Sequence, residues 1–294
     1  MTTTAVRTPA APRAEPTPRP RRRSRGAVWG LLAWVVGLVF FAPVAWMVLT
    51  SLHSEQAAAT NPPSLGAPLT LDGYREFFGA STGASPLPPL INSATASIVS
   101  TLIVLALAIP AAYALSIRPV RKWTDVLFFF LSTKMLPAVA GLLPIYLFAK
   151  QAGLLDNIWL MVLLYTSMNL PIAVWMMRSF LAEIPVEVLE AAAIDGAGLL
   201  TQFRTVIIPL AAPGIAATSL ICFIFSWNEM LFARVLTGVV SSTAPVFLTS
   251  FVTSQGLFLA KVCAAAVAVS LPVLLAGFAA QDKLVQGLSL GAVK

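Results

Sequence analysis

Long apolar stretches alternate with short polar segments along this chain, and six of the stretches are long enough to cross a lipid bilayer. A helix needs about 20 apolar residues to cross the hydrocarbon layer. Each such segment must be helical, because lipid cannot satisfy unpaired backbone groups. The six stretches are residues 27–49, 91–116, 126–148, 157–177, 213–233 and 262–281. The pattern predicts an all-α polytopic membrane protein with six transmembrane helices, built from residues 27–294.

Composition supports this fold class and argues against a soluble domain. Hydrophobic residues make up 58% of the 294 residues and charged residues only 11%, whereas about a quarter of a soluble domain is charged. The first apolar run, 27–49, is about twice as long as the core of a signal peptide, so we predict that it is retained as a span.

The basic residues predict the orientation. Residues 1–26 form a leader rich in Pro, Thr, Ala and Arg, a composition typical of disorder. If the N-terminus is inside, the inner segments hold 14 Lys and Arg residues and the outer segments hold four, with Lys134 inside a span. Because Lys and Arg are enriched on the cytoplasmic side, both termini are predicted to be cytoplasmic. We interpret the leader as holding this orientation, and we expect no nucleic-acid partner.

The longest outer segment, residues 50–90, is rich in Pro, Ser and Gly. It contains a short amphipathic piece, residues 71–78, for which the pattern suggests a position along the outer membrane interface.

The cytoplasmic loop at 178–210 has the pattern of two short helices. Pro185 suits a first helical turn, Glu187 and Glu190 suit the positive end of the helix, and Gly196 suits its left-handed stop. A second helical stretch is predicted at 200–207, ending before Pro209.

One face of the first short helix is predicted to be an apolar ridge. Val186, Leu189 and Ala193 recur at spacings of three and four, and Glu190 stands at the rim. A slim alanine-rich helix with such a ridge suits a helix-in-groove contact with a partner. The alternative is an ordinary surface hairpin between two spans.

This loop resembles the EAA loop of binding-protein-dependent ABC importer permeases, E-A-A-x3-G-x9-I-x-L-P. Five positions match, and Val206 and Ile208 stand where the family has Ile and Leu. The matching residues are Glu190, Ala191, Ala192, Gly196 and Pro209. The resemblance implies a type I importer permease fold with a cytoplasmic coupling helix that docks in an ATPase subunit. The residues implied in coupling are Val186, Leu189, Glu190, Ala191, Ala192, Ala193, Asp195, Gly196 and Pro209.

Residues 28–294 also resemble the carbohydrate permeases of the maltose and glycerol-phosphate class. Residues 226–230, Ser-Trp-Asn-Glu-Met, are similar to a conserved element of the fifth span, and 132–137, Ser-Thr-Lys-Met-Leu-Pro, resemble the third span of the sorbitol/mannitol branch. The resemblance implies a sugar or sugar-alcohol importer in the bacterial inner membrane. Its expected partners are a second permease, two ATPases, a solute-binding protein and membrane lipid. ATP and Mg²⁺ are expected at the ATPase, with no cofactor on this chain.

Polar residues inside the predicted spans are candidates for the solute path, because charge in a bilayer usually faces a cavity or a partner. The candidates are Lys134, Asn169, Trp227, Asn228 and Glu229. We expect the Trp227 ring to stack on a sugar, and Asn228 and Glu229 to bond hydroxyls. The alternatives are a structural pair of Glu229 with Arg234 at the outer interface, and a packing kink at Asn169 and Pro171.

Several motifs are missing from the sequence. The chain has no P-loop sequence and no nucleophile beside a base, so we predict a transport subunit with no catalytic residues. Its single His53 and its two cysteines form no metal-ligand pattern, so no metal site is predicted. The alternatives left open are an ABC permease for another solute class, an ion-coupled secondary transporter and a membrane-embedded enzyme.

Overall fold

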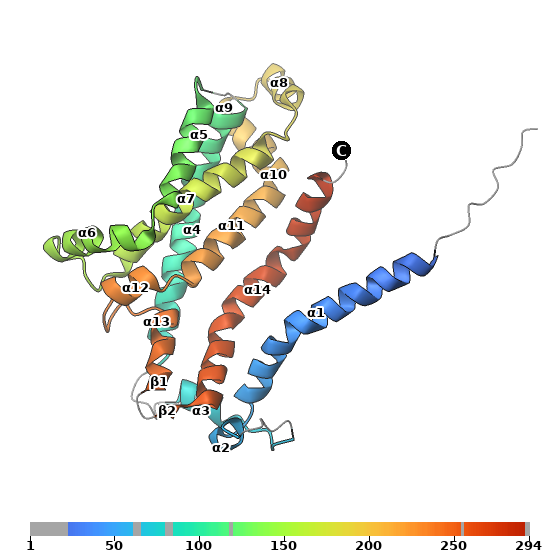
Figure 1. Cartoon of the computed structure of the whole chain (residues 1–294). Coiled ribbons are helices and arrows are strands. Elements are labelled where there is room, and N and C mark those ends of the chain that lie inside the picture. The colour runs from blue at the N-terminus through green and yellow to red at the C-terminus, as the bar shows by residue number, and fades with distance from the viewer. Residues whose placement is uncertain (1–22, 61–65, 80–84, 118–119, 254–255, 292–294) are drawn as a thin grey trace, which may run out of the picture. The chain divides into compact units, whose positions relative to one another are not determined.

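The computed structural model describes residues 23–60, 66–79, 85–117, 120–253 and 256–291 (Figure 1). The chain divides into two compact units, Met1–Trp46 and Met47–Lys294. Of the predicted leader, residues 1–22 lie outside the described residues, so its disorder stays a prediction. In the first unit the N-terminal part of α1 (Arg23–Ser51) is apolar and its side chains from Val28 to Val44 are exposed, as expected of a helix surrounded by lipid.

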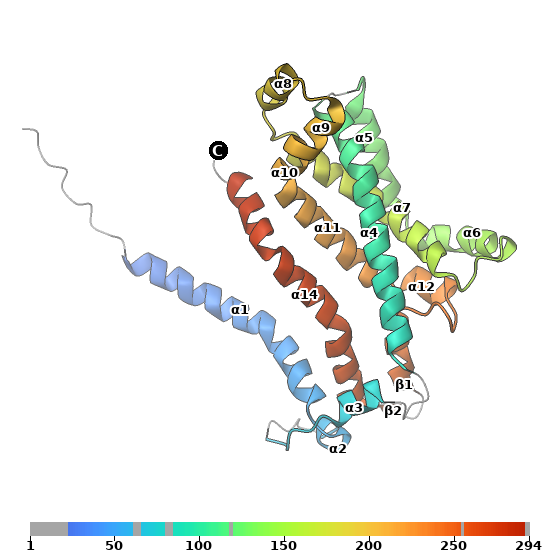
Figure 2. The same cartoon turned by 180° about the vertical axis from the view of Figure 1, so that it is seen from behind.

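The core of the second unit is made of four helices. α4 packs against α7 and α11, and α11 in turn packs against α14 (Figure 2). Small residues permit the closest approach: at Gly214 of α11, a Cβ atom would lie 2.3 Å from the ring of Phe180 at the end of α7. The bounds are α4 Leu87–Ser116, α7 Ile158–Leu181, α11 Ala212–Trp227 and α14 Leu259–Gly291.

Four of the described helices are each long and apolar enough to cross a membrane, and two bent pairs bring the number to six if each pair forms one span. The single helices are Val28–Ser51, Leu87–Ser116, Ile158–Leu181 and Leu259–Lys283. The predicted all-α class with six spans is therefore confirmed, but two of the spans are not straight.

The prediction of one continuous helix at 126–148 is wrong. α5 (Trp123–Ser132) continues into a 3₁₀ turn (Thr133–Met135), and α6 (Ala138–Gln151) then leaves at 84°. Leu136 is extended, with ψ 124°, as expected of a residue that precedes a proline. Figure 1 shows α6 running crosswise from the end of α5.

The predicted fifth span, 213–233, is also divided. α11 ends at Trp227, and the last predicted residues belong to the separate helix α12 (Leu231–Leu236). Before α11, the segment Leu199–Leu210 meets it at 76°.

The segments after α1 pack on the first turns of α14, at the end of the unit remote from helix α8 (Val186–Ile194). Phe77 is 1% exposed, and a Cβ at Gly73 would touch Ala264. The amphipathic piece predicted at 71–78 is helical and packs on α14 with one face; its position along the outer membrane interface stays a prediction. The short elements here are α2 Glu55–Ala58, α3 Asp72–Phe78, α13 Ala244–Leu248, a 3₁₀ turn Thr249–Phe251, and the antiparallel strands β1 Val252–Thr253 and β2 Gly256–Leu257.

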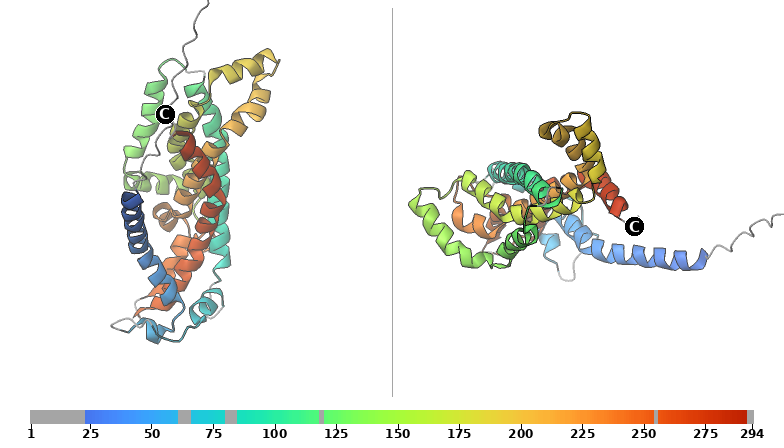
Figure 3. Two further views of the ribbon diagram at one scale, coloured as in Figure 1. Left: turned by 90° about the vertical axis from the view of Figure 1, so that its right-hand side faces the viewer. Right: turned by 90° about the horizontal axis from the view of Figure 1, so that it is seen from above.

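A helical hairpin projects at the opposite end of the unit (Figure 3). It consists of α8 (Val186–Ile194), α9 (Leu199–Gln202), a π-helical turn (Phe203–Ile207) and α10 (Ile208–Leu210).

Candidate coupling hairpin and solute pocket

The first helix of the hairpin has well-defined ends. Pro185 is extended and precedes the first turn of α8. At the other end Gly196 has φ +82°, its N–H bonds to the Ala193 carbonyl, and the Ala197 N–H bonds to the Ala192 carbonyl. These two bonds form a Schellman motif, which closes a helix and satisfies its last carbonyls. The left-handed stop predicted at Gly196 is confirmed.

The prediction that Val186, Leu189 and Ala193 form one apolar ridge on α8 is wrong. Leu189 is 6% exposed and belongs to the buried cluster that includes Ile184 and Ile207, so it faces the chain's own core. Ala192, at i+3 from Leu189, is half-buried on the same side. Leu189 points inward because it shares this buried cluster with apolar residues of α4 and α7.

The outward face of α8 carries a different set of residues. Val186 is 50% exposed and Ile194 86% exposed, and the exposed Glu190 lies between them at i+4 from each. We call Val186, Glu190 and Ile194 the outward ridge. The sequence did not lead us to place Ile194 on the outer face of α8. Its spacing of four from Glu190 puts it there once Leu189 is known to face inward. The remaining predicted residues Ala191, Ala193, Asp195, Gly196 and Pro209 are all exposed.

The second half of the hairpin does not end before Pro209, as predicted, but runs through it. The π-helical turn makes room for the proline, and the Ile208 N–H bonds to the Phe203 carbonyl, five residues back. Phe203 packs on Tyr113 of α4, with ring centroids 4.8 Å apart. The hairpin is thus joined to the membrane helices at both of its ends.

The break in the third span opens a pocket of about 520 Å³. The Lys134 ammonium lies in it and donates to the Met168 carbonyl of α7 at 2.6 Å. The lining residues are Thr133, Lys134, Met135, Leu136, Pro137, Ala138, Gly141, Ile145, Ser167, Met168, Pro171 and Phe232. Of the predicted solute-path residues, Lys134 alone is among them.

Asn169 lies outside this pocket, in the contact between helices. Its side chain is 3% exposed and donates to the Tyr165 carbonyl at 3.0 Å and to the Ser226 hydroxyl at 2.9 Å. Ser226 also lies 3.3 Å from the Ser100 hydroxyl of α4. The amide therefore joins α7 to α11 and, through Ser226, to α4, which favours the structural alternative stated for this residue.

The Trp-Asn-Glu element is held by local contacts. Trp227 is 3% exposed and its indole N–H donates to the Val269 carbonyl of α14 at 3.1 Å, so its ring is not free to stack on a solute here. The Asn228 amide donates to the Ile224 carbonyl, and the Glu229 carboxylate accepts the N–H groups of Phe232 and Ala233.

Glu229 therefore caps α12, a role that its position before a short helix would have predicted. It is not paired with Arg234, whose guanidinium donates to the Thr249 hydroxyl at 3.0 Å.

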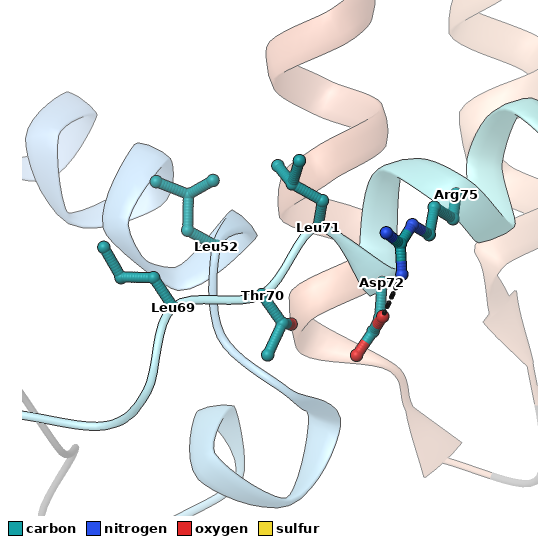
Figure 4. A pocket seen from close by; sticks show the side chains of 6 residues that line it. All are labelled: Leu52, Leu69, Thr70, Leu71, Asp72 and Arg75. Atoms are coloured by element: carbon teal, nitrogen blue, oxygen red, sulfur yellow. Dashed lines mark ion pairs between the residues drawn. The ribbon is translucent and has the colours of Figure 1, made fainter.

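A shallower pocket of about 460 Å³ lies near α3, at the end remote from α8. Its walls are Leu52, Leu69, Thr70, Leu71, Asp72 and Arg75 (Figure 4). Leu69 and Leu71 are exposed, and the Asp72–Arg75 ion pair spans 3.6 Å at the surface. This pocket holds none of the predicted site residues.

Asp156, which the sequence did not lead us to expect at a structured site, binds a backbone loop with its carboxylate. Its carboxylate accepts the backbone N–H groups of Gly238, Val240 and Ser241 at 2.7–3.1 Å. Desolvation by itself would raise the pKa of Asp156, but these hydrogen bonds outweigh it and hold the pKa below its ordinary value. An Asp in the short loop between α6 and α7 could have indicated this turn, because Asp tolerates the left-handed conformation that Asp156 adopts, with φ +55°.

Comparison with known proteins assigns the family. The model of the "Binding-protein-dependent transport system inner membrane component" family matches residues 104–289. The "Probable ABC transporter permease protein y4oR" of Sinorhizobium fredii is 38% identical over 93% of this chain and 97% of its own length. The "Trehalose transport system permease protein SugB" of Mycobacterium tuberculosis is 30% identical over 92% of this chain and 98% of its own length.

Among solved structures, a chain of a bacterial ABC transporter involved in the import of the acidic polysaccharide alginate has a similar fold. The TM-score is 0.70 at 23% identity, covering 92% of this chain and 100% of that one. This likeness shows the type I importer fold.

The broken spans, the projecting hairpin and these matches define a polytopic membrane permease. The chain belongs to the family of binding-protein-dependent transport system inner membrane components. It is the membrane-spanning permease subunit of an ATP-driven importer and not an enzyme, and it is a multi-pass inner-membrane protein. Such a subunit works with an ATPase, a binding protein and a second permease. The alternative of an ion-coupled secondary transporter is not favoured.

Proposed function

We propose that this importer carries a sugar or sugar alcohol, and that α8 couples it to the ATPase. The solute class is supported by relatives of nearly full length, such as the trehalose permease SugB, and by the resemblance of residues 132–137 to the polyol branch. In the assembly we propose, this chain pairs with a different permease chain and two ATPase subunits, and both termini and the α8 hairpin face the cytoplasm. ATP and Mg²⁺ bind at the ATPase.

The observation that carries the coupling role is the two-sided packing of α8. Its inner side, through Leu189, belongs to the same buried cluster as residues of α4 and α7, while its outward ridge is exposed. Ile194 offers an apolar anchor and Glu190 an acceptor of charge-assisted hydrogen bonds, the combination that suits a groove with a cationic or N–H-rich rim.

The mechanism follows from this packing. When ATP closes the ATPase pair, the docked α8 helices of the two permeases approach one another. Because Leu189 is packed among residues of the core, the ends of α4 and α7 move with α8. The membrane helices then exchange an inward-open for an outward-open cavity.

Charge reversal at the outward ridge tests the coupling role. Glu190→Lys is expected to leave insertion intact but to lower ATP-dependent uptake at least about tenfold, because it places a cation where a hydrogen-bond acceptor is required. The measurement is uptake of radiolabelled trehalose, mannitol and sorbitol by the complete importer in proteoliposomes, together with membrane content of the chain.

The matched control is Glu183→Lys, an exposed glutamate that precedes α8 in the same loop. It makes the same change in charge and is expected to keep uptake within about twofold of wild type, since surface substitutions away from a contact have small effects. Wild-type uptake by the Glu190→Lys importer would rule out the proposed coupling contact.

A further inference from the structure

The pocket at the α5–α6 break lies at membrane depth. The helical segment Trp123–Met135 rises about 20 Å from the α8 end of the unit, against a hydrocarbon layer of about 30 Å. Non-helical backbone at such a depth is stable only where protein buries it or where it lines a water-filled cavity. Discontinuous helices of this kind form the solute sites of many transporters.

Lys134 brings a positive charge into this pocket without a counter-ion. None of the lining residues is Asp or Glu, and within the described part of the chain Lys134 takes part in no ion pair. Its ammonium has three N–H donors, of which one bonds to the Met168 carbonyl. Two donors therefore remain for a ligand.

Two hydroxyls of the same pocket are available as acceptors. Ser167 already donates to the Leu164 carbonyl at 2.8 Å, and Thr133 donates to the Phe130 carbonyl at 2.7 Å. Because each hydroxyl has one hydrogen, a ligand meets their oxygen lone pairs. The rest of the wall is apolar, including Met135, Ile145 and Phe232.

This combination selects among solute chemistries. A hydroxyl group both donates and accepts, so neighbouring hydroxyls on a carbon chain satisfy Lys134 and the Ser167 and Thr133 oxygens together. A carboxylate only accepts, and would leave those oxygens without donors. The apolar wall suits the C–H faces between hydroxyls, and the volume lies within the usual range for small-molecule sites.

We propose that this pocket is a solute-binding subsite within this chain, in which the Lys134 ammonium donates hydrogen bonds to adjacent hydroxyls of a neutral polyhydroxylated solute. The proposal rests on the proposed function and assigns this chain, in addition to its sister permease, a direct contact with the cargo.

The test uses the complete importer in proteoliposomes, with its binding protein, and labelled D-mannitol, D-sorbitol, trehalose and D-glucuronate as probes. Lys134→Met keeps the side-chain length and removes the charge. It is expected to reduce uptake of the neutral probe that wild type transports best by about tenfold, chiefly through a raised KM, while ATP hydrolysis stimulated by the binding protein stays within about twofold. Lys134→Arg, which keeps the donors, restores part of the uptake.

The matched control is Lys150→Met, which makes the same change at the exposed far end of α6 and should leave uptake unchanged. A loss of ATP hydrolysis in proportion to uptake in Lys134→Met would show a structural role and overturn the subsite. Faster wild-type uptake of D-glucuronate than of any neutral probe would overturn the neutral class.

A second measurement keeps Lys134 in place, so it does not depend on the folding of the first variant. Met135 is 83% exposed and lines the pocket, and Met135→Cys in a Cys263→Ser background gives an accessible thiol for a charged thiol reagent, since Cys222 is buried. The transported probe is expected to slow the labelling at least about threefold. Absence of protection would overturn the subsite alone, whereas no uptake of any probe by wild type would overturn the proposed solute class as well.

Discussion

The third and fourth predicted spans share a sequence pattern at their centres, but one is broken there and the other is a continuous helix. Each carries a polar residue two or three positions before a proline: Lys134 before Pro137, and Asn169 before Pro171. The third span breaks at its proline and turns through 84°, whereas α7 continues through Pro171 as one helix of 24 residues.

The neighbours explain the difference. Asn169 is buried and bonds to the Tyr165 carbonyl within its own helix and to Ser226 of α11, so the helix around Pro171 is held on several sides. At the third span the residues from Thr133 to Ala140 are all exposed, and Thr133 and Ser132 bond back to carbonyls of α5 and complete its end. The side-chain contacts around each proline therefore differ: α7 is tied to α11 beside Pro171, whereas the residues around Pro137 make few contacts and the chain turns there.

The largest effect is expected where the enclosed helices touch. Gly214→Ala places a Cβ 2.3 Å from the Phe180 ring, so α7 and α11 must separate. We expect a loss of about 3 kcal/mol in stability, measured by thermal unfolding of the complex in detergent.

The matched control is Gly141→Ala in α6, where the added Cβ meets only the end of Ile145 at 3.6 Å. Because alanine favours a helix interior, this variant should be neutral or up to about 1 kcal/mol more stable. Equal destabilisation by both glycine substitutions would show that the two regions do not differ in packing.

A smaller loss is expected from Asn169→Leu. It removes the buried amide and leaves the Tyr165 carbonyl and the Ser226 hydroxyl with one partner fewer, at a cost of about 2 kcal/mol. The uptake KM should change little, in contrast to Lys134→Met. If Asn169→Leu raised KM without lowering the melting temperature, Asn169 would belong to the solute path after all.

The smallest effect is expected at Asp156, which fixes the junction of α6 and α7 to the loop after α12. Because the folded state holds the pKa of Asp156 below its ordinary value, its contribution is complete above the unfolded value of about 3.9 and is lost as the pH falls through the folded one. Asp156→Asn should cost about 1 kcal/mol at pH 7.

The control for Asp156→Asn is the pH dependence of its melting temperature relative to wild type. The difference in melting temperature between wild type and Asp156→Asn should be constant from pH 7 to pH 5 and shrink below about pH 4. A difference that persisted unchanged at pH 3 would mean that the carboxylate charge is not what stabilises the junction.

The sequence predicted the elements of this fold better than their directions. Apolar length located six spans, and Gly196 located the end of α8, because both depend on local composition. The break at Pro137 and the continuity at Pro171 could not be predicted, since they depend on which helices lie beside each proline.

The candidate site shows the same limit. Glu190 was correctly placed at the surface, but a helix with apolar residues on two sides does not reveal which side faces its own core, so Leu189 was put on the wrong face. Trp227 and Asn169 were selected for their chemistry, yet their partners Val269 and Ser226 lie 42 and 57 residues away along the chain. Contacts of that range are invisible to local patterns.

The position of Leu189 has a mechanical consequence. A coupling helix joined to the membrane helices only by flexible linkers would move with the ATPase without moving those helices. Here the side chain opposite the outward ridge is packed in the same cluster as residues of two membrane helices. In the coupling that we propose, the hairpin therefore passes a displacement of the outward ridge to the membrane helices, and shortening Leu189 would weaken this transmission while leaving the outward ridge itself unchanged.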